Sequence, residues 1–187
     1  MTVEEIFAKI SQHMVQGLMI HSEMSDYYNF LGLEGYSKCH LYHYYKESDS
    51  YKDLNDYFIK NYNKLIPESK NENPPIIPQT WYQYNRQQVD NATRKSSIQT
   101  GVVKWVNWEA ETKTLLQQMY KELITIDEVA GATKVKELLK DAVKEHTIAY
   151  QKMIELKAMD YDMAVIMSEQ DKLEDCYCKK IKKIYMC

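Results

Sequence analysis

The sequence predicts an all-helical protein, and two observations carry this prediction. Glycine and proline are scarce, with five glycines and four prolines among 187 residues, and all four prolines lie between Pro67 and Pro78. A β protein of this size would need such turn residues along its whole length. Apolar residues also recur at steps of three and four before and after the prolines, as they do on one face of a helix. We therefore expect long helices separated by one loop-rich segment.

The composition limits the class of protein. A length of 187 residues with 44% hydrophobic residues fits one domain with a continuous core. No stretch reaches the roughly 18 to 20 apolar residues of a membrane span, and the first residues, MTVEEIFAKI, lack the basic and apolar regions of a signal peptide. The formal charge of −3 offers no field that would attract a polyanion. We expect a cytoplasmic protein that binds neither membranes nor nucleic acid.

The first two helices are expected from about Val3 to Leu31 and from about Tyr36 to Leu65, with a turn between them. The inward stripe of the first helix alternates steps of four and three: Ile10, Met14, Gly17, His21, Met24, Tyr28 and Leu31. Two faces of the second helix compete for the interior, so its register stays open. One face carries Tyr36, His40, His43, Glu47, Ser50, Leu54 and Tyr57, and the other carries Leu41, Tyr44, Tyr51 and Phe58.

A long connection precedes the third helix. The segment PESKNENPPIIPQ has the composition of a loop, and the connection over about 67–90 is long enough to run from one end of a helical bundle to the other. The third helix is expected to begin near Asp90, which with Asn91 offers an N-cap. Its heptad positions are Val102, Trp105, Glu109, Thr112, Leu116, Met119, Leu123 and Ile126.

A break around Gly131 is expected to lead to a fourth helix that starts near Thr133. Its inward stripe is Leu139, Ala142, His146, Ala149, Met153, Leu156, Asp160, Met163 and Met167. This extended fourth helix would run to about Ser168, which gives a bundle domain over 1–168 and a helical or flexible tail over 169–187. Its overhang and the tail, CYCKKIKKIYMC, are expected to pack against Trp81–Tyr84 or against a second copy of the chain.

The order of the helices predicts their directions. Short links make antiparallel neighbours, and a long middle connection lets the second and third helices run parallel. In this arrangement His21, Glu47, Glu109 and His146 fall on inner faces, each about midway along its helix. Buried carboxylates and imidazoles without partners are costly, so such groups meet one another or a cation. The predicted site therefore lies at one level on the bundle axis.

These residues resemble those of the ferritin-like superfamily. The segment GYSKCHLYHYYKESDSYKDL is similar to the second ferritin helix, with Glu47 in place of the glutamate of its Glu-x-x-His motif and Ser50 in place of the histidine. The segment WEAETKTLLQQMYKEL is similar to the third helix, with Glu109 in place of the metal-ligand glutamate. On the first helix His21 takes the place of the usual glutamate, and Tyr28 follows as an aromatic that the family favours.

The resemblance implies an all-α, ferritin-like four-helix bundle with one long crossover, over roughly residues 3–168, and a metal centre inside it. A two-metal centre of this kind uses a glutamate from two helices and Glu-x-x-His from the other two. Here Ser50, Thr112 and Ile148 stand at the histidine places. Hydroxyl groups are poor substitutes for imidazole as ligands, so a single-ion or vestigial site is favoured over a two-iron oxidase. The candidate ligands for iron, manganese or zinc are His21, His43, Glu47, Glu109, Glu145 and His146.

An alternative of another class stays open. The same residues could form a buried polar layer without any ion, in a non-catalytic interaction or structural protein. The 16 tyrosines favour a homo-oligomer or a protein partner that binds a Tyr- and Trp-rich surface, which His40 and His43 could also face. We expect His13 to be solvated. Cys176, Cys178 and Cys187 are expected to be spare thiols rather than ligands of a soft metal. The sequence assigns no reaction or substrate.

Overall fold

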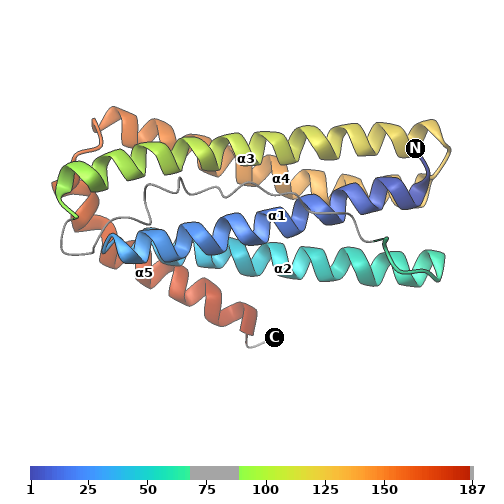
Figure 1. The fold of residues 1–187 in the computed structure, drawn as a ribbon, viewed down its shortest axis with the longest axis horizontal. Helices are drawn as coiled ribbons and strands as arrows, with labels where there is room; N and C mark the ends of the chain where they lie inside the picture. Colours follow the sequence, from blue (N-terminus) through green and yellow to red (C-terminus); the bar gives the residue numbers. More distant parts are fainter. Residues whose placement is uncertain (68–88, 186–187) are drawn as a thin grey trace. The chain divides into compact units, whose positions relative to one another are not determined.

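The computed structural model describes residues 1–67 and 89–185, and these residues fold into α-helices without a strand (Figure 1). The helices are α1 (Val3–Phe30), α2 (Glu34–Tyr62), α3 (Asn91–Thr125), α4 (Val129–Ala158) and α5 (Met163–Tyr185). The all-α prediction is confirmed. None of the described helices is long and apolar enough to cross a membrane.

The chain divides into two compact units, and α1, α2 and α3 each contribute to both. The first unit comprises Met1–Val15, Asp49–Glu72 and Val102–Glu155, and the second comprises Gln16–Ser48, Asn73–Gly101 and Leu156–Cys187.

The first unit is built around an apolar core to which α1, α2, α3 and α4 all contribute. Within this unit α2 and α3 run in one direction and α1 and α4 in the opposite direction (Figure 1). This confirms the directions predicted from the long connection, most of which lies outside the described residues. Fully burying each leucine, isoleucine or phenylalanine stabilises the fold by about 1.5–3 kcal/mol. The core residues are Ile6, Phe7, Ile10, Met14, Leu54, Phe58, Leu116, Met119, Leu123, Ala132, Val135, Leu138 and Ala142.

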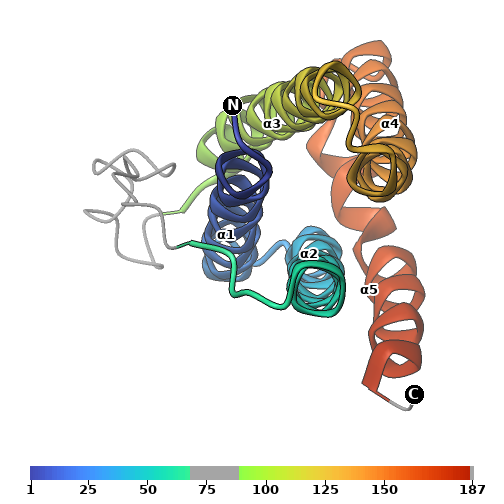
Figure 2. The same cartoon turned by 90° about the vertical axis from the view of Figure 1, so that its right-hand side faces the viewer.

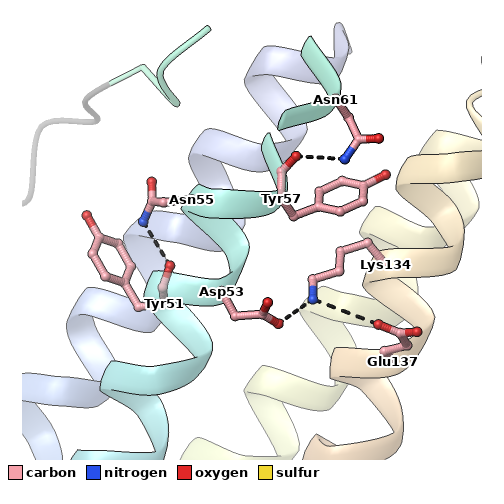
Figure 3. A network of polar contacts seen from close by, with 7 residues as sticks. All are labelled: Tyr51, Asp53, Asn55, Tyr57, Asn61, Lys134 and Glu137. Atoms are coloured by element: carbon pink, nitrogen blue, oxygen red, sulfur yellow. Dashed lines mark hydrogen bonds and ion pairs between the residues drawn. The ribbon is translucent and has the colours of Figure 1, made fainter. Parts of the chain in front are cut away.

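A polar network joins α2 to α4 beside this core (Figure 3). The ammonium group of Lys134 donates to the carboxylate of Asp53 and lies 3.8 Å from that of Glu137. It also lies 5.8 Å from the centre of the Tyr57 ring. The Lys134 side chain is only 10% exposed, so these acidic and aromatic partners compensate for its loss of water.

Side chains cap the beginnings of α1 and α3. Thr2 and Glu5 form a reciprocal capping box at α1, with 3.2 and 2.8 Å hydrogen bonds. At α3 the Asp90 carboxylate accepts from the Thr93 backbone N–H at 2.7 Å, which confirms the predicted N-cap.

The ends of α1, α3 and α4 share one backbone motif, in which a residue in the left-handed conformation closes the helix. Gly32 fills this position after α1 (φ +72°), Asp127 after α3 (φ +60°) and Asp160 after α4 (φ +48°). The following N–H groups bond back five residues; that of Tyr161, for example, donates to the Leu156 carbonyl at 2.9 Å.

Two predicted boundaries are therefore wrong. The break expected around Gly131 lies at Asp127, and Gly131 is inside α4. The extended fourth helix ends at Ala158, and a separate α5 follows. The Asp162 carboxylate starts α5 by accepting from the Ala164 backbone N–H at 2.8 Å. An aspartate that stops one helix and another that starts the next divide a stripe that reads as continuous in the sequence.

Within the second unit α5 contacts α2 (Figure 2). The Gly35 backbone N–H donates to the Gln170 side-chain oxygen at 2.9 Å, and the rings of Tyr42 and Tyr177 lie 5.7 Å apart. The expected partner Trp81–Tyr84 lies outside the described residues. The prediction considered that segment or a second copy, but the observed partner is an earlier helix of the same chain.

Candidate functional site

Three histidines meet in the second unit: His21 on α1 and His40 and His43 on α2. They are 1%, 2% and 4% exposed, respectively. His40 and His43 are three residues apart and so share one face of α2. The ring centre of His21 lies 5.3 Å from that of His40 and 5.2 Å from that of His43, and the latter two are 6.4 Å apart. We call these residues the histidine cluster.

The histidine cluster is uncharged at neutral pH. His21 Nδ1 and His40 Nδ1 are hydrogen-bonded at 3.0 Å, so one ring donates its single proton and the other accepts. Burial lowers the pKa of His21 to about 3. Burial, and then the neighbouring histidines, lower the pKa values of His40 and His43 well below the ordinary value. Neutral imidazole is the state in which histidine binds metal ions.

Aromatic and basic groups surround the cluster. The buried Tyr28 ring stacks on His40 with 5.4 Å between ring centres, and burial raises the pKa of its phenol. The positive charges of Lys46 and Lys180 further lower the pKa of His43, after burial and the other histidines. The Lys180 ammonium group lies 5.3 Å from the Tyr42 ring centre.

Glu109 is the most deeply buried of the predicted carboxylates. It belongs to the first unit and is 2% exposed, which confirms that it points inward. Its Oε1 accepts a hydrogen bond from the Trp105 indole N–H at 3.0 Å, one helical turn away.

Thr112, at the place of a ligand histidine, is held by two hydrogen bonds. Its hydroxyl donates to the Trp108 carbonyl at 2.9 Å, so the 2.7 Å contact with His13 must be donated by His13 Nε2–H. The His13 ring also stacks on Trp108, with 4.0 Å between ring centres. His13 was expected to be solvated; that expectation is wrong, because α3 offers it both an aromatic face and an acceptor.

On α4 the structure favours Glu145 over His146 as the inward residue. The buried residues of this helix are Gly131, Ala132, Val135, Leu138, Ala142, Ala149 and Leu156. Glu145 continues their spacing and has a buried carboxylate oxygen. His146 is half-buried and stacks on Tyr150, which is 48% exposed.

The six predicted ligands fall in both units. His21, His43 and the half-buried Glu47 belong to the second unit, and Glu109, Glu145 and His146 belong to the first. Their convergence at one level stays a prediction. Within the second unit His21 and His43 do come together, and with them His40. The alternative that His40 and His43 face a partner surface is wrong, because both side chains are buried. The sequence pattern that indicated their burial was their position on the same predicted helix face as Tyr36 and Glu47.

The residues do not fit a two-metal carboxylate centre. Ser50 and Thr112 replace ligand histidines, and the Thr112 hydroxyl already serves Trp108 and His13. Among residues 1–67 and 89–185, no group of three or more His, Cys, Asp or Glu side chains is arranged so that it could hold a metal ion.

Solved structures of ferritins share this fold. A closed form of the Archaeoglobus fulgidus ferritin superposes with a TM-score of 0.75 at 12% identity, covering 93% of this chain and 96% of the other. The open-pore ferritin of the same archaeon gives 0.74 at 12% identity, covering 91% and 93%. A variant of PmFTN soaked in iron gives 0.71 at 12% identity, covering 89% and 95%. No family model and no curated protein matches the sequence. The chain therefore has a ferritin-like all-α fold, which confirms the fold that the resemblance implies.

Proposed function

We propose that this chain is a ferritin-like metal-binding protein that holds a single divalent ion through mid-helix histidine and glutamate side chains. The observation that carries the proposal is the histidine cluster, in which three buried, neutral imidazoles lie within 6.4 Å of one another. Burying three rings that could each bind water or a proton is costly unless they bind one another or a cation. The ferritin-like fold supports the ion, since a structural neighbour was soaked in iron.

The chain's own groups would act as follows. His21, His40 and His43 would supply nitrogen ligands, and Tyr28 would cover His40. A bound ion would supply a fixed double positive charge that links α1 to α2. The proposal assigns no reaction and no substrate.

Metal analysis tests this proposal. The protein is stripped with a chelator, equilibrated separately with Fe²⁺ without oxygen, Mn²⁺ and Zn²⁺, desalted and analysed for metal. We expect about one ion per chain, lost in the triple variant H21L/H40L/H43L and retained in H146Q, whose histidine lies outside the cluster. Wild-type protein with no more metal than the triple variant would overturn the proposal. A variant that stays folded by circular dichroism would then support the structural alternative, because apolar replacement of a buried polar layer can be neutral.

A homo-oligomer is the partner that we propose. Val143, Tyr150 and Ile154 follow one another along the outward face of α4 and are 43%, 48% and 49% exposed. Apolar and tyrosine side chains on one face of a surface helix are typical of an interface. The cytoplasmic location and the absence of a nucleic-acid partner stay predictions.

A further inference from the structure

We infer that the outward face of α5 binds the same face of a second copy of the chain, with the two helices antiparallel. In this arrangement each aspartate on the face of one copy lies opposite a lysine of the other. The inference goes beyond metal binding. It specifies an additional contact for the homo-oligomer, and so it rests on that part of the proposed function.

The outward face is the side of α5 that turns away from α2. On the opposite side Gln170, Leu173 and Tyr177 lie against Gly35 and Tyr42 of α2, within the second unit. Exposed side chains at steps of three and four residues follow one another along the outward face, as they do on one face of a helix. We call them the charged stripe: Ser168, Asp171, Asp175, Lys179 and Lys182.

Like charges are neighbours along the charged stripe. Asp171 and Asp175 are four residues apart, and Lys179 and Lys182 are three residues apart. Side chains at these spacings are adjacent on a helix, so like charges there destabilise it. None of the four forms an ion pair with another residue in the described part of the chain. The order of charges is therefore unfavourable for an isolated helix and favours a partner with the opposite order.

The helix dipole does not explain this order of charges. The dipole favours acidic residues in the first turn of a helix and basic residues in the last, and its effect is small elsewhere. The first turn of α5 has no acidic residue, and Asp171 and Asp175 lie in its middle turns. The dipole therefore accounts for Lys182 in the last turn, but not for the two aspartates or for Lys179.

The charged stripe is complementary to itself. Asp175 precedes Tyr177 by as many residues as Lys179 follows it, and Asp171 and Lys182 are also nearly equidistant from Tyr177. A two-fold axis at the level of Tyr177 therefore places Asp175 opposite Lys179 and Asp171 opposite Lys182, and symmetry makes each pair occur twice. A parallel pair of α5 helices would instead place like charges opposite each other. The order of charges thus selects the antiparallel pair.

The contact between two α5 helices is expected to be weak, because exposed ion pairs contribute little individually and salt screens them. It should therefore be measured at low ionic strength and without the apolar contact proposed for α4. The variant Y150E/I154E provides this background, since it places charges on the outward face of α4 and leaves α5 unchanged. In sedimentation equilibrium we expect the background protein to associate weakly at low salt and to be monomeric at high salt.

Two charge-swap variants of this background test the inference. D171K/D175K leaves only lysines among the charged residues of the stripe, and K179D/K182D leaves only aspartates. Each variant alone should associate more weakly than the background protein, because its stripe repels a second copy. An equimolar mixture of the two should associate roughly tenfold more tightly than the background protein at low salt, and this gain should disappear at high salt.

Matched controls make the same changes of charge on another helix. D49K/D56K and K52D/K60D change exposed residues of α2, and their mixture should associate no more tightly than the background protein. Circular dichroism checks that all variants remain helical. A mixture of the stripe variants that associates no more tightly than the control mixture would overturn the inference, although a wild-type oligomer that Y150E/I154E dissociates would still support the α4 contact. A wild-type chain that is monomeric at every concentration would overturn the homo-oligomer, and the inference with it.

Discussion

The phenol oxygen of Tyr28 on α1 occupies the space that a side chain at Gly101 on α3 would need. A Cβ at Gly101 would lie 1.9 Å from that oxygen and 3.0 Å from the ring carbon that carries it. Gly101 is buried, and Tyr28 is 1% exposed and stacks on His40. The absence of a side chain at position 101 therefore allows a tyrosine to lie against the histidine cluster.

Replacing Gly101 with alanine should destabilise the protein, because the added methyl group overlaps the Tyr28 phenol. We expect a loss of about 2 kcal/mol in the free energy of unfolding, measured by urea denaturation. G131A is the matched control: its Cβ would lie 3.1 Å from the end of the Tyr62 side chain, and alanine favours the helix. Y28F should partly rescue G101A, and equal stability of G101A and G131A would contradict the overlap.

His13 should make the protein sensitive to acid. Burial lowers its pKa from 6.5 to about 4, so between these values the unfolded chain binds a proton that the folded chain does not. Stability from this residue is therefore complete above pH 6.5 and falls as the pH drops towards 4, by up to about 3 kcal/mol. H13Q keeps a donor for Thr112 and should flatten this part of the curve of unfolding free energy against pH. H146Q, at a half-buried position, should change the pH dependence of the unfolding free energy much less. Identical curves for wild type and H13Q would show that His13 does not cause the sensitivity to acid.

Asp127 holds a backbone conformation that glycine adopts more easily, with φ +60°. D127G should stabilise the protein by about 0.5–1 kcal/mol, because it relieves the strain of a side chain in this conformation. D127V should destabilise it, since a β-branched residue is the least tolerant of positive φ. Thermal and urea denaturation measure both, and a destabilised D127G would show that the Asp127 side chain contributes a contact of its own.

Gln170 should control whether α5 stays on α2. Its buried amide accepts from the Gly35 N–H at 2.9 Å and donates to the Ile166 carbonyl at 3.1 Å. In Q170A the Gly35 N–H loses its acceptor, which costs about 1–3 kcal/mol when no water replaces it. Hydrogen exchange should then speed up over α5 more than over α4. E169A, one residue earlier and less buried, is the control, and uniform exchange in all three proteins would contradict this role.

The outward face of α4 should mediate self-association. Y150E/I154E places two charges on this face, so we expect a wild-type oligomer to shift to smaller species in sedimentation velocity. Q118E, at an exposed position of α3, should leave the oligomer unchanged. A wild-type protein that is monomeric at all concentrations would end this prediction.

The sequence was sufficient for the helices but not for all of their ends. Gly32 is the residue type that usually occupies the left-handed position at a helix end, so the end of α1 could be predicted. Asp127 and Asp160 adopt the same left-handed conformation although they are not glycine, so the ends of α3 and α4 could not. The break between α3 and α4 was therefore predicted at Gly131, which lies within α4. Residues 159–162 were predicted to be helical because Leu156, Met163 and Met167 keep the spacing of one helix face.

The inward face of α4, and with it part of the candidate site, was predicted one position away from where it lies. Ala142 and Ala149 fit either of two neighbouring stripes on α4, and the choice between them depended on the residues in between. Leu139 and Met153 look more like core than Glu145 and Lys152, so hydrophobicity favoured the stripe with His146. The structure selects the polar one, with Glu145 inward and the Lys152 side chain only 21% exposed. A polar layer inside a bundle misleads any assignment that ranks positions by hydrophobicity.

The hydrogen bond between the Gly35 N–H and the Gln170 side chain joins positions 135 residues apart. During synthesis it can therefore form only after most of the chain has been made. A helical pair made of α1 and α2 can form early, because its contacts are local in sequence. The α2 face that carries Tyr42 remains without α5 until the ribosome has added well over a hundred further residues. At about 5–20 residues per second, this interval lasts on the order of ten seconds. During that time this face of α2 is open to water, so the nascent chain exposes the Tyr42 ring before α5 can cover it.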